Sequence, residues 1–313
     1  APPNASPSIS GMLRGVSKSA DAPLSRTHLR ALIAAFLGWA FDGLDGYIYV
    51  LVALRFVGQL IDKPPKDPET IHKATIIQAV FLVGWAVGGM VFGRIGDRVG
   101  RARTLTLTVL TYAIFTGLAF FATEWWHLLI FRFVAALGIG GEWAAGSALV
   151  AETLPARHRY WASALLQSGY MIGCILASLT SGILSEFDPR YVFLVGVVPA
   201  FLTVFIRRAV PEPEGWAEAQ KHQKVPPVTA LLAPDLRRTT IIVASFVSIA
   251  LVISWGFLFF LPNVIRTIPE TKGWSESEIA RLGTRVAITF FTVNIFANFA
   301  ATYAAKWLGY RRA

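Results

Sequence analysis

Long apolar stretches separated by short polar ones run through most of this 313-residue chain. An α-helix rises about 1.5 Å per residue, so about 20 apolar residues cross a bilayer core of about 30 Å. Eight stretches approach or exceed that length. They cover residues 30–56, 74–92, 104–122, 126–151, 160–184, 191–207, 240–263 and 285–305. The pattern predicts an all-α membrane protein with eight transmembrane helices.

The composition agrees with this pattern. Hydrophobic residues make up 54% of the chain and charged residues 15%, and the mean hydropathy is +0.53. A soluble globule of this composition would expose a large apolar surface to water. The expected partner of the chain is therefore a lipid bilayer.

The net charge of +10 raises the question of a nucleic-acid partner, so we examined how the charge is distributed. With the N-terminus placed in the cytoplasm, 19 Lys and Arg residues lie on the inner side and 9 on the outer side, and Arg132 lies within a span. This asymmetry is typical of positive-inside topology. No basic patch is interleaved with base-stacking aromatic residues, so we expect no nucleic-acid partner. The sequence predicts a multi-pass protein of the inner or plasma membrane with a cytoplasmic N-terminus.

Polar segments divide the chain into four parts. Residues 1–28 are rich in Ser, Pro and Ala and predict a disordered cytoplasmic tail. Residues 29–209 carry six spans and predict an N-terminal six-helix bundle. Residues 210–239 are polar and proline-rich, as expected of a cytoplasmic linker. Residues 240–313 carry two spans, which predict a partial C-terminal bundle.

A dense Gly/Arg segment, Gly93-Arg-Ile-Gly-Asp-Arg-Val-Gly-Arg-Ala-Arg103, lies between the second and third spans. It predicts a cationic hairpin in the cytoplasm. The pattern Gly-x-x-x-Asp-Arg-x-Gly-Arg-x-Arg resembles the signature loop between the second and third helices of the major facilitator superfamily of transporters. The start of the linker, Pro211-Glu-Pro-Glu-Gly-Trp216, resembles the end of the sixth helix in sugar- and metabolite-transporting facilitators.

The resemblance implies the major facilitator fold, here as a six-helix N-terminal bundle plus the first two helices of the C-terminal bundle. Shifting the sequence by 209 residues sets Gly100 on Gly309 and Arg103 on Arg312, as expected of a decayed second copy of the signature loop. Facilitators have two parallel repeats of six helices that rock about a central site. By analogy, we expect four more spans in the whole protein and take this chain to be a fragment.

The resemblance also implies a cytoplasmic gating network. In facilitators, charged residues of the signature loop and of the inner end of the fourth helix latch the helices in the outward-open state. The alternative is that these charges only follow the positive-inside rule and have no gating role. The matching positions here are Gly93, Gly96, Asp97, Arg98, Gly100, Arg101, Arg103, Glu152, Arg157 and Arg159.

Two carboxylates, Asp42 and Asp45, lie near the middle of the first span. Residues three apart share one face of a helix. Carboxylates at bilayer depth cost several kcal/mol unless they are paired, hydrated or protonated. Burial favours the neutral carboxyl form, so the pair is a candidate proton carrier. The alternative is structural pairing with a neighbouring helix.

The fourth span contributes Arg132 and Glu142. Ten residues correspond to about 1000° of helical rotation, so the two side chains point about 80° apart and need separate partners. A permanent cation in a polar cavity suits a carboxylate ligand, whereas the alternative for Arg132 is snorkelling to the outer leaflet.

Two motifs in these spans resemble those of proton symporters. Arg-x-x-x-x-x-Gly-x-Gly-Gly-Glu resembles the fourth helix of the metabolite:proton and sialate:proton families, and Asp-Gly-x-Asp the first helix of the aromatic-acid:proton and sialate:proton families. The resemblance implies that Asp42, Asp45 and Glu142 couple protons and that Arg132 binds substrate. Further polar residues within spans are candidates for lining the substrate cavity, or else for hydrogen bonds between helices. They are Tyr47, Gln167, Tyr170, Asn294 and Asn298.

Several kinds of chemistry are not indicated. The single cysteine, Cys174, excludes a disulfide within the chain, and the five histidines have no metal-ligand spacing. No phosphate-binding loop of the Walker type occurs. We therefore expect no cofactor, no metal and no enzymatic activity.

The function predicted from the sequence is proton-coupled symport of a small organic anion by a monomer through alternating access. The anion is a carboxylate, aromatic acid or sugar acid. The alternatives are a sugar or polyol facilitator and a non-transporting membrane sensor.

Overall fold

The computed structural model describes residues 23–213, 216 and 228–308. All regular structure in these residues is helical. The N-terminal part contains α2 Arg26–Leu60, α3 Pro68–Val99, α4 Arg101–Ala119, α5 Trp125–Thr153, α6 Ala156–Ile183, η1 Pro189–Tyr191, α7 Val192–Val195 and α8 Ala200–Ala209. It is followed by η2 Val228–Leu232, α10 Arg237–Thr267, η3 Pro269–Thr271 and α11 Glu276–Leu308.

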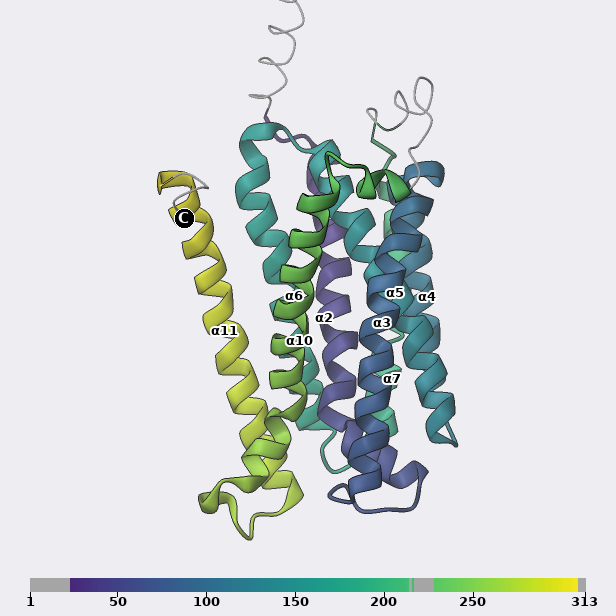
Figure 1. Ribbon diagram of the computed structural model, residues 1–313, viewed down its shortest axis with the longest axis vertical. Helices are drawn as coiled ribbons and strands as arrows, with labels where there is room; N and C mark the ends of the chain where they lie inside the picture. The colour runs from purple at the N-terminus through teal and green to yellow at the C-terminus, as the bar shows by residue number, and fades with distance from the viewer. Residues whose placement is uncertain (1–22, 214–215, 217–227, 309–313) are drawn as a thin grey trace, which may run out of the picture.

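Eight segments of the described chain are long and apolar enough to cross a membrane. They coincide with the eight predicted spans, which confirms the all-α membrane fold. The long helices run side by side along the long axis of the molecule (Figure 1). Most of them extend several residues beyond the apolar stretches, since hydropathy marks only the part of a helix that lies in hydrocarbon.

The first helix begins earlier than expected. Ser25 caps α2, because its hydroxyl accepts a hydrogen bond from the backbone N–H of His28 and the imidazole of His28 accepts one from the N–H of Ser25. Two orphan donors at the helix start are thereby satisfied. The helix therefore includes residues 26–28 of the segment predicted to be a tail. Residues 1–22 of that segment lie outside the described residues.

The predicted hairpin over residues 93–103 is wrong in extent. Helix α3 continues to Val99 and α4 begins at Arg101, so Gly100 alone separates them. Gly100 has a φ of 118°, a conformation that glycine adopts readily and other residues do not. The signature residues therefore lie on two helix ends that meet at a sharp corner.

The sixth span is interrupted. A single helix was expected over residues 191–207, but α7 ends at Val195 and α8 begins at Ala200. The backbone N–H groups of Gly196, Val197 and Val198 bond to carbonyls three residues back. Pro199 has no N–H to donate to the helix, which accounts for the irregular turn before it.

Helix α2 is the core of the bundle and packs closely against α6. In its most apolar window 78% of the residues are buried, against 11% in α10 and in α11. A methyl group at Gly173 of α6 would overlap the carbonyl oxygen of Ala40, and one at Gly43 of α2 would overlap that of Tyr170. Small residues at such positions let neighbouring backbones touch in lipid. This approach brings Tyr170 beside the polar residues of α2.

Candidate functional site

Asp45 of α2 and Arg132 of α5 form an ion pair in the centre of the bundle. The Nη1 atom of Arg132 lies 3.1 Å from each carboxylate oxygen of Asp45, and Nη2 donates to the backbone carbonyl of Asp45 at 3.0 Å. The hydroxyl of Thr116 on α4 donates to Asp45 Oδ1 at 2.5 Å. Both charged side chains are 0% exposed. The hydrogen bonds and the paired charge compensate the cost of removing these groups from water.

Aromatic rings enclose the guanidinium of Arg132. Its Cζ atom lies 4.6 Å from the ring centre of Phe81 and 5.6 Å from that of Tyr49. Cation–π contacts of this length favour a desolvated arginine. The alternative interpretation, in which Arg132 snorkels to the outer leaflet, is therefore wrong.

Asp42 and Glu142 form a second acidic contact one turn away. Their side chains are 0% and 1% exposed, and the two carboxyl groups face each other. Neither oxygen of Asp42, nor Oε2 of Glu142, has a hydrogen-bond partner of good geometry among the described residues. Glu142 fits beside Gly38, where a Cβ would overlap its Oε1 atom. Two ionised carboxylates in contact in an apolar interior repel strongly, so the arrangement suits a pair that holds one proton.

Arg132 and Glu142 thus have separate partners, in agreement with their rotation along the helix. The two aspartates of α2 also differ: Asp45 faces a cation and a hydroxyl, whereas Asp42 faces another acid. The sequence places both aspartates on one helix face, and it did not predict that they have different partners.

The remaining predicted cavity residues are spread over the molecule. Tyr170 lies at the site: its hydroxyl is 3.5 Å from where a Cβ on Gly46 would stand. Tyr47 is 1% exposed and packs edge-on against Phe291 of α11. Asn298 donates from Nδ2 to the carbonyl of Ala164, which joins α11 to α6.

Asn294 bonds only within its own helix, to the carbonyl of Phe290. Gln167 is half-buried on α6. The structure therefore places Asp42, Asp45, Arg132, Glu142 and Tyr170 together and leaves both asparagines outside that group.

Sequence reasoning missed a group of aromatic residues beside the ion pair. Tryptophan is enriched at membrane interfaces, so indoles in the middle of apolar spans were the available signal. The members of this group are Trp39, Phe81, Trp85, Trp143 and Trp255.

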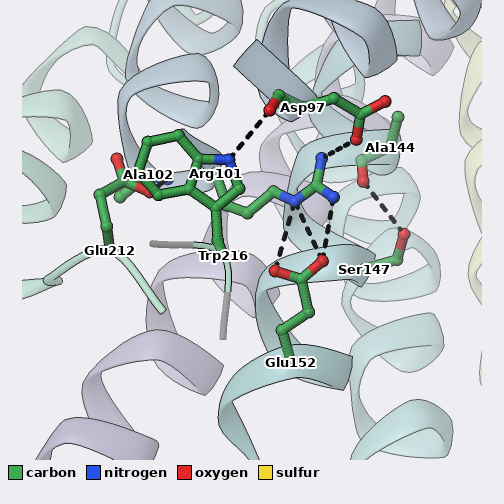
Figure 2. Close-up of polar contacts among 8 residues, drawn as sticks. All are labelled: Asp97, Arg101, Ala102, Ala144, Ser147, Glu152, Glu212 and Trp216. Carbon is green, nitrogen blue, oxygen red and sulfur yellow. Dashed lines mark hydrogen bonds and ion pairs between the residues drawn. The ribbon is translucent and has the colours of Figure 1, made fainter. Parts of the chain in front are cut away.

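A second polar cluster lies at the corner between α3 and α4 (Figure 2). Arg101 donates from Nη1 to Asp97 at 2.7 Å and from Nη2 to Glu152 at 2.9 Å, and its Nε also donates to Glu152. The predicted network therefore centres on Arg101, which joins three helix ends. Its side chain is 15% exposed, and those of Asp97 and Glu152 are 39% and 32% exposed.

The linker start closes over the same corner. The carboxylate of Glu212 accepts from the backbone N–H groups of Ala102 and Arg103, at 3.1 and 3.0 Å. These are orphan donors of the first turn of α4, and a negative charge there is favoured by the helix dipole. The indole of Trp216 donates to the carbonyl of Asp97 at 3.1 Å (Figure 2). The motif that resembled the end of the sixth helix thus caps the start of α4.

The glycines of the segment allow these contacts. A Cβ at Gly100 would clash with Glu212, and one at Gly96 would stand 3.2 Å from Arg101 Nη1. Gly93 faces Ala144 of α5 with ordinary spacing.

Two of the other predicted gating residues bond to groups outside the Arg101 cluster. Arg157 donates to the imidazole of His158, and Arg159 donates to the carbonyl of Leu154 at the start of α6. Arg98 is exposed on α3, and the side chain of Arg103 is exposed although its backbone bonds to Glu212. The resemblance to the facilitators' charge network had grouped these arginines with Asp97. Within the described ranges, no three His, Cys, Asp or Glu side chains are placed to hold a metal ion.

Known proteins resemble this chain in sequence. It is 38% identical over 192 residues to a Haemophilus influenzae protein, 30% over 214 residues to the sialic acid transporter NanX of Escherichia coli, and 29% over 223 residues to the cis,cis-muconate transport protein of Acinetobacter baylyi. These matches cover 61%, 68% and 71% of this chain and 46%, 51% and 50% of the relatives. The chain thus spans about half the length of these curated relatives.

Solved structures share the fold. The xylose symporter XylE bound to 6-bromo-6-deoxy-D-glucose superposes with a TM-score of 0.68 at 16% identity, over 89% of this chain and 69% of XylE. Residues 31–313 match the family model of the Major Facilitator Superfamily. The chain belongs to the Major Facilitator Superfamily of membrane transporters.

Proposed function

We propose that this protein is a secondary transporter that moves a small organic anion together with a proton by alternating access. The observation that carries the proposal is the fully buried Asp45–Arg132 pair. The names of two relatives support the substrate class, because sialic acid and cis,cis-muconate are carboxylates.

The ion pair suggests how anion and proton are coupled. A buried charge without a partner is strongly unfavourable, so Arg132 needs a negative partner whenever the site is closed and dry. Asp45 is that partner in the empty, deprotonated site. When Asp45 takes a proton, a substrate carboxylate replaces it and binds the planar guanidinium bidentately. Either both ligands or neither are present in the closed state, which is symport.

Asp42 and Glu142 extend this proposal. Their contact holds one proton in the closed state, because neither faces a cation in the described structure. The groups that face Asp42 are Glu142, Asp45, Tyr112 and Tyr170. A neutral pair here keeps negative charge away from Asp45 and leaves Arg132 as its main electrostatic neighbour.

The Arg101 cluster is proposed as the cytoplasmic gate. It joins α3, α4 and α5 through groups that water reaches, so its contacts can break and form at low cost. We propose that the protein lies in the inner or plasma membrane as a monomer with its N-terminus in the cytoplasm.

Uptake into proteoliposomes tests the proposal. A panel of carboxylates is offered with and without an inward proton gradient, and a neutral sugar serves as the matched control. We expect accumulation of at least one carboxylate that depends on the gradient. Sugar uptake independent of the gradient indicates a facilitator, and ligand binding without flux indicates a sensor; either result overturns the proposal.

A further inference from the structure

Five aromatic side chains from four helices meet beside the Asp45–Arg132 pair, and we call them the aromatic cage. Trp39 lies 4.9 Å from Tyr170 and 6.4 Å from Trp85 between ring centres, and Trp85 lies 6.0 Å from Phe81 and 5.5 Å from Trp255. Trp39, Phe81, Tyr170 and Trp255 are 9% exposed or less. Edge-on and tilted pairs at these distances are the favourable geometries for aromatic rings.

The aromatic cage lies directly beside the ion pair. The Phe81 ring is the one that lies 4.6 Å from Arg132 Cζ. Gly46, the residue after Asp45, presents bare backbone to the cage: a Cβ there would stand 3.5 Å from both Trp255 Cη2 and the Tyr170 hydroxyl. The cage therefore adjoins Arg132 through Phe81 and adjoins Asp45 through Gly46.

Two polar atoms in the cage wall are unpartnered. The indole N–H of Trp39 and the hydroxyl of Tyr170 are buried and have no hydrogen-bond partner of good geometry among the residues that the structure describes, and the hydroxyl has only the thiol of Cys174, a weak partner, beside it. Buried donors normally find a partner. Both atoms are therefore available to a polar substituent on a ring held inside the cage.

Trp255 occupies the cage from the side of α10. Most of α10 is exposed, yet this indole is 4% exposed and packs against both Phe81 and Trp85. The indole reaches Gly46 of α2: its Cη2 atom lies 3.5 Å from where a Cβ on Gly46 would stand. An aromatic ring thus already fits the space next to the ion pair.

We propose that the aromatic cage binds the ring of a planar aromatic carboxylate whose carboxylate group is held by Arg132, and that the Trp255 indole occupies the ring position in the state described here. Trp39 and Tyr170 then bind a polar substituent on the ring. The inference rests on the proposed function, since it assigns one class of organic anion to the same site.

Binding of matched carboxylates tests this inference. The probes are benzoate and cyclohexanecarboxylate, which have the same charge and similar size but differ in planarity and π electrons, and glucuronate as a non-aromatic sugar acid. Dissociation constants are measured by calorimetry on the purified protein. We expect benzoate to bind about tenfold more tightly than cyclohexanecarboxylate, since ring pairs contribute beyond their buried area.

Two variants test the residues. Trp85→Leu should weaken benzoate about tenfold and leave cyclohexanecarboxylate within about twofold. Tyr170→Phe, which keeps the ring and the packing, should remove the advantage of 4-hydroxybenzoate over benzoate. Trp126→Leu is the matched control, because Trp126 is 48% exposed at the start of α5 and should change neither preference.

The outcomes separate the two proposals. Equal binding of benzoate and cyclohexanecarboxylate, or equal weakening of both by Trp85→Leu, overturns the aromatic cage and leaves organic-anion transport intact. Tight binding of glucuronate without binding of benzoate also overturns the aromatic cage and leaves organic-anion transport intact. Failure of every carboxylate to bind overturns the proposed function, and the cage proposal with it.

Discussion

Two of the arginine–aspartate pairs in the described part of the chain have similar geometry but lie in different surroundings. Arg132–Asp45 and Arg101–Asp97 have N–O distances of 3.1 and 2.7 Å. The first pair is 0% exposed on both sides, whereas Arg101 and Asp97 are 15% and 39% exposed. Breaking a buried pair costs about 3–5 kcal/mol, and an exposed pair contributes about 0–1 kcal/mol. Water access therefore decides which pair fits coupling and which fits gating.

The largest expected effect comes from removing one member of the buried pair. Asp45→Ala leaves the charge of Arg132 without its partner and should lower the free energy of unfolding by about 3–5 kcal/mol. The double variant Asp45→Ala/Arg132→Ala should recover a large part of that loss. Denaturation of the purified protein in detergent measures both.

If the double variant is as unstable as the sum of the two single variants, the residues do not act as a pair. Asp45 and Arg132 could then not be compared, as a pair, with the Arg101 cluster.

A smaller effect is expected at the corner of α3 and α4. Glu212→Ala removes the carboxylate that accepts from two N–H groups of the first turn of α4. Loss of an N-terminal cap costs about 1 kcal/mol, and the same denaturation experiment should show a loss of that size. Glu186→Ala, at an exposed position between α6 and η1, is the control and should show none. If the two variants lose the same stability, Glu212 does not stabilise the start of α4.

Asp97→Asn sharpens the comparison from the exposed side. We expect less than about 1 kcal/mol of stability to be lost, because water screens this pair. Transport should slow strongly while substrate affinity stays within a few-fold, since Asp97 lies at the corner of α3 and α4 and not beside Arg132. Parallel uptake and binding assays separate the two quantities, and equal loss of both would point to a folding defect.

The smallest expected effect on stability is that of Asp42→Asn. If Asp42 and Glu142 already share one proton, an amide in place of one acid keeps the contact neutral and costs within about 1 kcal/mol. A loss comparable to that of Asp45→Ala would show that Asp42 is charged in the folded protein. Asp42 would then belong with the ion pairs.

The helices and the residue types of the site could be predicted from the sequence, because apolar length and intramembrane charge are local properties. Arg132 and Glu142 were correctly assigned separate partners from their rotation along one helix. The choice of Asp45 as the partner of Arg132 was not predictable, because it depends on how closely α2 approaches its neighbours at positions such as Gly43 and Gly173.

The partners of individual side chains could not be predicted from the motifs. Arg157 and Arg159 matched the gating pattern but bond to His158 and to Leu154. The aromatic cage escaped notice because its rings are scattered over α2, α3, α6 and α10, and each ring alone is typical of an apolar span. Only the fold shows that these rings meet and that one of them, Phe81, lies against Arg132.

The central claim is that Asp45 carries the proton that drives uptake. The most direct test compares gradient-driven accumulation with exchange of labelled substrate at equilibrium, in proteoliposomes containing the native protein or Asp45→Asn. The amide imitates the protonated acid, so we predict that the variant still exchanges substrate across the membrane but no longer accumulates it against a concentration gradient. Full accumulation by Asp45→Asn under an inward proton gradient would contradict the account.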